Sequence, residues 1–419
     1  MIGLYFGTAL FIMKEEIAVK EYYLSELLEL KYGKDHKTLG NGTIPCYGSG
    51  GVIRYVNNSL YEKESILIPR KGSLNNLFFI NKPFWTVDTL FWSIINEKIV
   101  LPRYLFYKLK NLNLSSFNEG SAVPSLTTKT LNKISIKIHD LKLQEKIVSI
   151  LSLLDEKIEL NKKINQNLEE IAQALFKRWF IDFEFPNKEG KPYKSSGGKM
   201  IKSELGEIPE GWETSELGKI VQISSGKRPK IKFEKNNIKE SLYPIVGANG
   251  IMGYTNDFLI EDNVILIGRV GTIGNIKIYT FKIWPSDNTL IITSSYLEYM
   301  FFILKLFDFT QINRGSTQPL ITQTDIKNLK IVVSKKYLAK FCNIISNNFK
   351  LIEQNQKETE KLIELRDYLL PKLMNGEIDV SNLKIFEILN SDLSFYLIQF
   401  FHLIKIKLKQ FFFEYLPLE

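Results

Sequence analysis

The sequence predicts a mixed α/β (α+β) fold in which two β-rich modules alternate with two long helices that pair as an antiparallel, pseudo-two-fold coiled coil. The main observation is an internal repeat, because residues 45–55 return as residues 244–254 at an offset of 199 positions. The second observation is a change of pattern after each β-rich stretch. Short apolar runs give way to seam residues spaced alternately four and three positions apart, as in a coiled coil. The length of 419 residues leaves room for two domains, each with its own core.

Each module is predicted to be β-rich, since short apolar runs lie between Gly, Asn and Asp turn residues. The repeat continues without a gap to an Arg-x-Gly motif, at residues 70–72 and 269–271. A Gly-Ser-x-x-Pro motif closes each module, at residues 120–124 and 315–319. The offset has fallen to 195 there and is 194 in the helices, so insertions and deletions lie inside the modules.

A coiled-coil seam runs through more than four heptads after the first module and recurs 194 residues later. Asn161 and Asn355 occupy equivalent seam positions, where a buried amide would fix the register by hydrogen-bonding across the interface. The other residues predicted to pair the helices are Leu168, Leu175, Leu362 and Leu369. The alternative is two ordinary amphipathic helices in separate domains, although neither helix has much domain of its own to pack against.

These patterns divide the chain into modules, helical regions and a connector. The predicted modules span residues 17–141 and 213–335, the helical regions span 142–185 and 336–380, and the connector spans 186–212. The connector is polar and rich in Gly, Pro, Lys and Ser, which predicts a flexible surface segment.

Both ends of the chain fall outside the repeat. Residues 1–16 contain an apolar run, residues 2–13, that is too short to cross a bilayer and lacks the features of a signal peptide. We interpret it as an extra strand or the product of an upstream start codon. Residues 381–419 form an apolar tail interrupted by lysines, either a partner-facing or membrane-surface helix or a packed or aberrant tail. No stable membrane association is expected.

The positive charge of the chain lies in the two modules. The net charge is +9 and the pI is near 9.1. Residues 17–141 carry +6 and residues 214–335 carry +5, whereas the helical regions are close to neutral. A polyanion such as a nucleic acid is therefore expected to bind the modules. Two cysteines, Cys46 and Cys342, are too few for a disulfide framework, which predicts a reducing, cytoplasmic location.

The connector ends in the segment SELGEIPEGW, residues 203–212. This segment, followed by a basic β-rich module, an Arg-x-Gly turn, a Gly-Ser-x-x-Pro loop and a long helix, resembles the specificity subunit of type I restriction-modification enzymes. The resemblance covers roughly residues 17–380. It implies two target-recognition domains, each reading one half of a split sequence in double-stranded DNA, and two conserved helical regions that set the spacer between the halves.

The resemblance also implies partners and a division of labour. Two methylation subunits are expected to dock on the helical regions and to supply S-adenosylmethionine, and motor-nuclease restriction subunits are expected to join for cleavage. This chain is then a non-catalytic subunit without a cofactor of its own. The alternatives are a stand-alone or partly functional DNA-recognition protein, and an enzyme of unknown class hidden in the modules.

Missing motifs agree with a non-catalytic chain. The sequence has no Gly-x-x-x-x-Gly-Lys-[Ser/Thr] phosphate loop and no Asn/Asp-Pro-Pro-aromatic segment of the kind found in adenine methyltransferases. Its three histidines, His36, His139 and His402, are scattered and predict no metal site.

Arg70 and Arg269 are the first candidates for DNA contact, because each follows an apolar strand and stands two residues before a glycine. A guanidinium in this position reaches a phosphate or the O6/N7 edge of guanine, and the glycine lets the backbone approach closely. The alternative is that each arginine pairs with a carboxylate of its own module, such as Asp88 or Asp287.

Further candidates differ between the repeats or carry charge. Lys71, Ser73 and Arg54 are replaced by Val270, Thr272 and Gly253, so the two modules present different side chains from one frame. Basic residues after a glycine are candidates for phosphate contact, with a solvated loop as the alternative. The remaining predicted DNA-binding residues are Lys34, Lys37, Lys227, Arg228, Lys230, Asn249 and Arg314.

Overall fold

The computed structural model describes residues 19–233, 242–315 and 317–381, so both apolar ends considered above lie outside the described residues. The chain forms two compact units. Unit 1 contains residues 1–159 and 359–419, and unit 2 contains residues 160–358. Each β-rich module belongs to one unit, while each long helix contributes one end to each unit.

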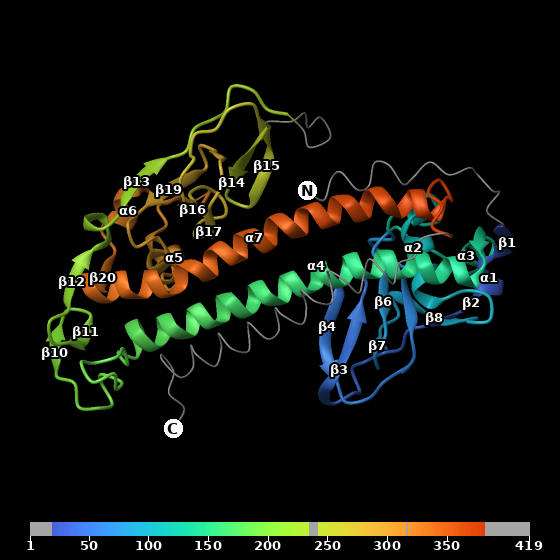
Figure 1. Cartoon of the computed structure of the whole chain (residues 1–419), viewed down its shortest axis with the longest axis horizontal. Helices are drawn as coiled ribbons and strands as arrows, with labels where there is room; N and C mark the ends of the chain where they lie inside the picture. Colours follow the sequence, from blue (N-terminus) through green and yellow to red (C-terminus); the bar gives the residue numbers. More distant parts are fainter. Residues whose placement is uncertain (1–18, 234–241, 316, 382–419) are drawn as a thin grey trace. The chain divides into compact units, whose positions relative to one another are not determined.

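Module 1 consists of three small sheets with short helices beside them (Figure 1). The strand orders are β2-β8-β5-β6 and β4-β3-β7, and β1 pairs antiparallel with β9 to bring the two ends of the module together. The strands are β1 (Val19–Tyr23), β2 (Leu28–Tyr32), β3 (Asn41–Gly48), β4 (Gly51–Val56), β5 (Ser65–Pro69), β6 (Phe78–Ile80), β7 (Trp85–Thr86), β8 (Leu90–Ile95) and β9 (Ser135–His139), and the helices are α1 (Leu24–Leu27), α2 (Pro102–Lys110) and α3 (Thr128–Asn132).

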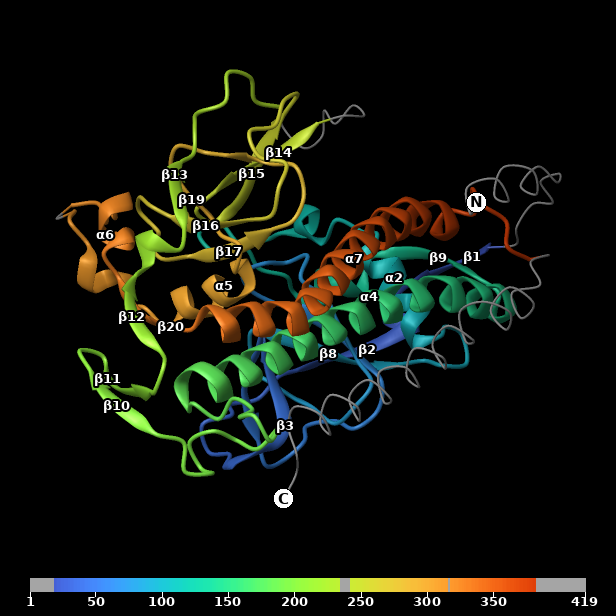
Figure 2. The ribbon, with the colours of Figure 1, turned by 60° about the vertical axis from the view of Figure 1, so that its left-hand side comes forward.

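Module 2 repeats this topology strand for strand (Figure 2). Its sheets have the orders β13-β19-β16-β17 and β15-β14-β18, and β12 pairs with β20 as β1 does with β9. The strands are β12 (Glu213–Glu216), β13 (Gln222–Ser225), β14 (Tyr243–Gly247), β15 (Gly250–Thr255), β16 (Val264–Gly268), β17 (Ile276–Tyr279), β18 (Trp284–Pro285), β19 (Thr289–Thr293) and β20 (Lys330–Val333), and the helices are α5 (Leu297–Lys305) and α6 (Gln323–Lys327). The sequence repeat is therefore a repeat of fold.

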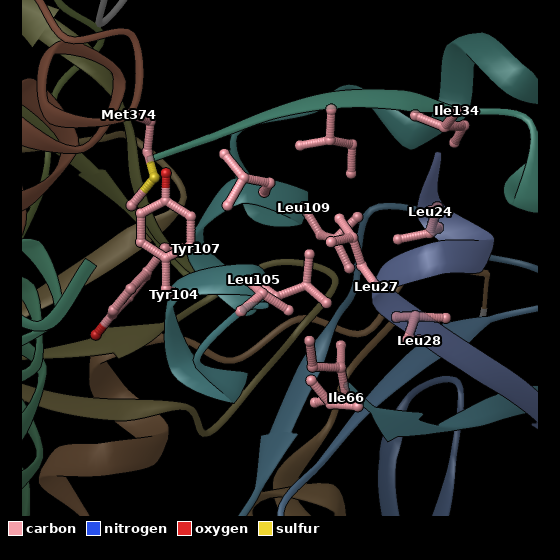
Figure 3. Packing of buried hydrophobic residues seen from close by; sticks show 14 of the residues in the cluster. Leu24, Leu27, Leu28, Ile66, Tyr104, Leu105, Tyr107, Leu109, Ile134 and Met374 are labelled. Carbon is pink, nitrogen blue, oxygen red and sulfur yellow. The ribbon is translucent and has the colours of Figure 1, made fainter. Parts of the chain in front are cut away.

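The core of unit 1 lies between the four-stranded sheet and the helices. All five residues of β5 are buried: four are apolar, and the hydroxyl of the fifth, Ser65, donates to the carbonyl of Ser93. Figure 3 shows Tyr104 and Tyr107 of α2 in this core, together with Leu24 of α1. Burying a large apolar side chain of this kind contributes about 1.5–3 kcal/mol.

The long helices α4 (Leu141–Phe176) and α7 (Lys335–Met374) are antiparallel within each unit. In unit 2 an amide network joins them: Asn161 Nδ2 donates to the carboxylate of Glu358 (2.8 Å), and Asn355 Nδ2 donates to Asn165 Oδ1 (2.8 Å). In unit 1 the guanidinium of Arg366 on α7 binds Asp155 on α4 at 3.0 Å. The predicted fold class, in which two β-rich modules alternate along the chain with two long helices, is confirmed.

The residues predicted to pair the helices are buried to different degrees. Asn161, Asn355 and Leu175 are buried. Leu168, Leu362 and Leu369 are half-buried. Among the described residues, no helix combines the length and the apolar character that crossing a bilayer would require.

The C-terminal end of α7 completes the core of module 1. Leu373 and Met374 are buried in the same cluster as α1 and α2, and Figure 3 shows Met374 beside Tyr107. The ammonium of Lys108 on α2 donates to the main-chain carbonyl of Met374. A cation at a helix C-terminus satisfies a carbonyl that has no partner within the helix. Module 1 therefore depends on residues more than 200 positions away.

Module 2 is completed in the same way by the C-terminal end of α4 and the π-helical turn Lys177–Ile181 that follows it. Phe176 and Phe180 pack against Tyr299 on α5, with ring centroids 5.7 and 4.7 Å apart. Trp179 is fully buried and lies 6.3 Å from the ring of Phe341 on α7.

The connector over residues 186–212 is structured, which corrects the prediction of a flexible segment. It contains a hairpin of β10 (Met200–Ser203) and β11 (Gly206–Pro209). Trp212 is buried and stacks on Phe185, with ring centroids 4.8 Å apart. The prediction failed because it was based on the overall polar composition of the connector. A few buried aromatic side chains are enough to hold a polar segment in place.

His139 joins module 1 to α4. Its Nδ1 lies 2.7 Å from the hydroxyl of Tyr104, and its carbonyl accepts a hydrogen bond from Gln144 Nε2 (2.8 Å). Burial, aided by the charge of Lys108, lowers the pKa of His139 from 6.5 to about 4. The folded chain therefore keeps this imidazole neutral under conditions where the unfolded chain protonates it.

A pH dependence of stability follows from this shift. Because the folded-state pKa lies below the unfolded value, stability should fall as the pH drops from about 6.5 to about 4, by at most about 1.4 kcal/mol per pH unit. Denaturant titrations of the full chain across this range check the prediction. The His139→Gln variant should lack this component, and equal pH slopes for both proteins would contradict it.

Candidate nucleic-acid interface

In each module, hydrogen bonds join three loops to one another, and hydrogen bonds to neighbouring strands hold a fourth, basic loop. We call these four the reading loops. In module 1 they are a basic loop (33–40), a hairpin turn (48–51), an Arg-Gly loop (70–76) and a closing loop (118–125). In module 2 the equivalent loops are 226–233, 247–250, 269–275 and the described residues 313–315 and 317–320.

In module 1 the Arg-Gly loop is the centre of the cluster. Asn76 Nδ2 donates to the carbonyl of Ser49 in the hairpin turn (2.8 Å), and the amide of Gly72 donates to the carbonyl of Pro124 in the closing loop (3.0 Å). The basic loop is held by the indole of Trp85, which donates to the carbonyl of Lys34 (3.0 Å).

Module 2 repeats these bonds with equivalent residues. Asn275 Nδ2 donates to the carbonyl of Ala248 (2.6 Å), and the amide of Gly271 donates to the carbonyl of Pro319 (3.0 Å). The indole of Trp284 donates to the carbonyl of Lys227 (2.7 Å). One backbone frame therefore presents both sets of reading loops.

Glycine is required at two points of this frame. Gly72 and Gly271 have φ angles of 90° and 73°, in the left-handed region that other residues adopt only at a cost. The sequence motif Arg-x-Gly is thus explained by the turn that follows β5 and β16.

The closing loops are braced by one asparagine each. Asn118 Oδ1 accepts from the amides of Gly120 and Ser125, as Asn313 Oδ1 accepts from the equivalent amides in module 2. The next residue differs in charge. Glu119 accepts a hydrogen bond from the hydroxyl of Thr130.

Arg314 stands at the place of Glu119 and binds a carboxylate of its own module. Its Nε donates to Asp325 Oδ1 (2.9 Å), and Asp325 is also part of the N-cap of α6. The Arg314 side chain keeps 61% of its surface exposed, so this contact leaves part of the guanidinium accessible.

Arg70 is held by its own module. Its Nη1 donates to the carbonyl of Asp88 (3.1 Å) and lies 3.9 Å from the carboxylate of the same residue. The guanidinium also lies over the ring of Tyr32, 5.4 Å from the centroid. These contacts favour the intramodular alternative for Arg70.

Arg269 has a different environment although its backbone is equivalent. Its Nη1 donates to Ser225 Oγ at a long 3.4 Å, and its buried Nε has no hydrogen-bond partner among the described residues. The predicted partner Asp287 binds Arg228 instead, at 3.2 Å. The pair Arg269–Asp287 is therefore not formed.

The other candidates fall into two groups. Arg54 donates to the carbonyl of Leu39 and to Asn41 Oδ1, both at 3.1 Å, and so fastens β4 to the end of the basic loop. The candidates whose residues are exposed on the reading loops are Lys34, Lys37, Lys71, Ser73, Lys227, Lys230, Asn249 and Thr272.

Two features of the interface were missed from the sequence. Tyr32 and Ser225 occupy equivalent positions before Gly33 and Gly226, and each contacts the arginine of its module. Aligning the two glycines would have identified this pair. The second strand of each hairpin also exposes apolar side chains beside the turn, namely Val52, Ile53, Tyr55, Ile251 and Met252.

Among the described residues, no group of three or more His, Cys, Asp and Glu side chains is placed to hold a metal ion. The reading loops present main-chain amides together with lysine and arginine side chains. This donor set suits phosphates and base edges.

Comparison with known proteins agrees with this interpretation. A family model described as the type I restriction modification DNA specificity domain matches the chain twice, over residues 17–170 and 209–362. The MjaIX specificity subunit of a type I restriction enzyme from Methanocaldococcus jannaschii is 30% identical over 357 residues, covering 77% of this chain and 80% of that protein. The HindI specificity subunit from Haemophilus influenzae is 28% identical over 397 residues, covering 74% and 85%.

The fold has a solved counterpart as well. The S subunit of a type I restriction-modification system from M. genitalium matches with a TM-score of 0.63 at 17% identity, covering 87% of this chain and 98% of that chain. Because the family model matches most of the chain in two copies, and a relative at 30% identity aligns with 77% of it, the chain belongs to the family of type I restriction-modification specificity subunits.

Proposed function

We propose that this DNA-recognition subunit reads a bipartite target in double-stranded DNA, with one half-site for each module. The observation that carries the proposal is the duplicated frame of reading loops, held by equivalent hydrogen bonds in both modules. A frame that is built twice provides two readers, and two readers suit a target in two parts.

The side chains on the frame differ, which makes the expected target asymmetric. Tyr32, Lys71 and Glu119 in module 1 correspond to Ser225, Val270 and Arg314 in module 2. These residues lie in or next to the reading loops, where changes of charge and size alter which base edges are accepted.

Exposed lysines on the basic loops supply the sequence-independent part of binding. Lys34 and Lys37 in module 1 have Lys227 and Lys230 at the equivalent positions in module 2, and all four residues are exposed. Lysines at such sites neutralise phosphates and release counterions, so the affinity for DNA should fall steeply with salt.

The helices have a separate role in the proposal. α4 and α7 set the number of base pairs between the half-sites, and they dock two methylation subunits that bind S-adenosylmethionine and transfer the methyl group. Restriction subunits join this assembly for cleavage. The chain itself is non-catalytic and acts in the cytoplasm.

Purification of the tagged full-length chain from its source cells tests the proposal. The chain should recover a methylation subunit, and the complex should methylate duplex DNA at a two-part sequence, whereas the chain alone should bind duplex DNA without methylating it. Methyl transfer by the chain alone would contradict the non-catalytic role. Recovery of the DNA-binding chain without any methylation subunit would favour the alternative of a stand-alone recognition protein.

A further inference from the structure

The two Arg-Gly loops differ in the charges that surround them. Gly33 aligns with Gly226 at an offset of 193, so Asp35 in module 1 stands at the place of Arg228 in module 2. Lys34 and Lys37 match Lys227 and Lys230, while Lys232 stands at the place of Leu39 and adds one positive charge to module 2. The exchange of Asp35 for Arg228 adds two. The exchange of an aspartate for an arginine is therefore the main difference in charge between the basic loops.

We call positions 35, 70 and 88, which are equivalent to positions 228, 269 and 287, the corner of each module. In module 1 these positions hold two carboxylates and one guanidinium. Asp88 is engaged with Arg70 through its carbonyl at 3.1 Å and its carboxylate at 3.9 Å. Asp35 accepts a hydrogen bond from the amide of Lys37 (3.0 Å) and stays within its own loop. Arg70, Asp35 and Asp88 together carry a formal charge of −1, and Lys71, which is exposed beside Arg70 where module 2 has Val270, brings the local sum to zero. A phosphate is attracted less strongly by a neutral set of charges than by a positive one.

In module 2 the same corner contains two guanidinium groups and one carboxylate. Arg228 holds Asp287, with 3.2 Å between Nη2 and Oδ2. Arg269 makes only the long bond to Ser225, and within the described residues it forms no ion pair. The formal charge of Arg228, Arg269 and Asp287 is +1, which favours an anion.

We propose that Arg228 is a positioning residue that keeps Asp287 away from Arg269 and so leaves the Arg269 guanidinium available to DNA. Arg269 then binds a phosphate or a guanine edge for module 2. Arg70, at the equivalent position, instead contacts residues of its own module. The inference deepens the proposed function and rests on it.

In module 2, Arg228 and Arg269 compete for the carboxylate of Asp287. A partly buried guanidinium that makes few hydrogen bonds is stabilised by any nearby anion. Asp287 stands at the position equivalent to Asp88, the residue that holds Arg70 in module 1. When Arg228 occupies Asp287, no carboxylate among the described residues of module 2 pairs with Arg269, which leaves its guanidinium open to an anion from outside the module. Replacing Arg228 by aspartate removes the competitor and places at this position the residue type that module 1 has there, Asp35.

A set of paired substitutions in the full-length chain tests this, with affinity for a mixed-sequence 40-base-pair duplex as the readout. Arg269→Ala should weaken binding about tenfold in the otherwise unchanged chain, and less than about twofold when Arg228→Asp is also present. Comparing the effect of Arg269→Ala in the two backgrounds removes any direct contribution of Arg228 to phosphate binding.

Matched controls come from the loops themselves. Lys230→Asp places a carboxylate two residues from Arg228 but does not free Asp287, so Arg269→Ala should still cost about tenfold in that background. In module 1, Arg70→Ala should cost less than about twofold alone and about tenfold together with Asp35→Arg, which supplies a competitor for Asp88. Arg228 is 84% exposed, so its replacement should leave the fold intact, and thermal melting of each variant checks this.

The outcomes separate the inference from the proposed function. If Arg269→Ala costs the same with and without Arg228→Asp, or if Arg70→Ala costs as much as Arg269→Ala in the unchanged chain, the positioning role of Arg228 is wrong while DNA binding stands. If the unchanged chain binds no duplex at low salt, the proposed function fails and the inference fails with it.

Discussion

Replacing Trp179 by alanine is expected to lower the free energy of unfolding by about 3–5 kcal/mol, the range for a large aromatic side chain removed from a core. Trp179 is fully buried in the π-helical turn Lys177–Ile181 that follows α4, where its ring lies 6.3 Å from those of Tyr337 and Phe341. The substitution would leave a cavity in the core of unit 2, where residues from the first half of the chain pack against module 2. Equilibrium unfolding in denaturant, followed by circular dichroism, measures the loss.

Trp179→Phe is the matched control. The Trp179 Nε1 has no hydrogen-bond partner among the described residues, so phenylalanine sacrifices no polar contact and keeps an aromatic ring. Its cost should stay below about 1.5 kcal/mol. A Trp179→Ala protein that unfolds at the same denaturant concentration as the unchanged chain would show that this contact does not support unit 2.

Replacing Leu373 by alanine is expected to cost about 2–5 kcal/mol and to loosen module 1, which begins some 350 positions earlier in the sequence. Leu373 is buried in the core cluster that includes Tyr104 and Ile66. Hydrogen exchange measures the effect locally: amide protection in β5 and β8 should fall well before protection in β16 and β19.

The control for this prediction lies on the same helix. Tyr368 is 60% exposed, and its replacement by alanine should change the free energy of unfolding by about 0.5 kcal/mol or less. If Leu373→Ala resembles Tyr368→Ala, or if it reduces protection mainly in β16 and β19, the end of α7 is not part of the core of module 1.

The sequence was sufficient for the architecture because the features that define it are repeated and periodic. The 199-residue offset identified the modules, and the seam through Asn161 and Asn355 identified the helices. Both patterns depend only on which positions are apolar and how they are spaced. The structured connector was missed because Trp212 and Phe185 act through stacking with residues from other elements, which composition does not record.

The backbone turns of the interface were predictable from the sequence, but its ion pairs between side chains were less so. The Arg-x-Gly motif correctly indicated a glycine turn after an apolar strand in both modules. Which arginine keeps a carboxylate partner was not evident, because Asp287 is held by Arg228, some 60 positions earlier. The pair Arg314–Asp325 joins residues 11 positions apart across a loop and an N-cap, a geometry that no spacing rule predicts.

Exchange of one module tests the bipartite reading most directly. Residues 214–332 would be replaced by the corresponding module of another family member, and the chimera expressed with its methylation subunits. Long-read sequencing would then map the methylated adenines. Two separate readers predict that one half of the methylated sequence changes while the other half and the spacer length stay the same. A change in both halves, or in neither, would contradict a subunit in which each module reads its own half-site.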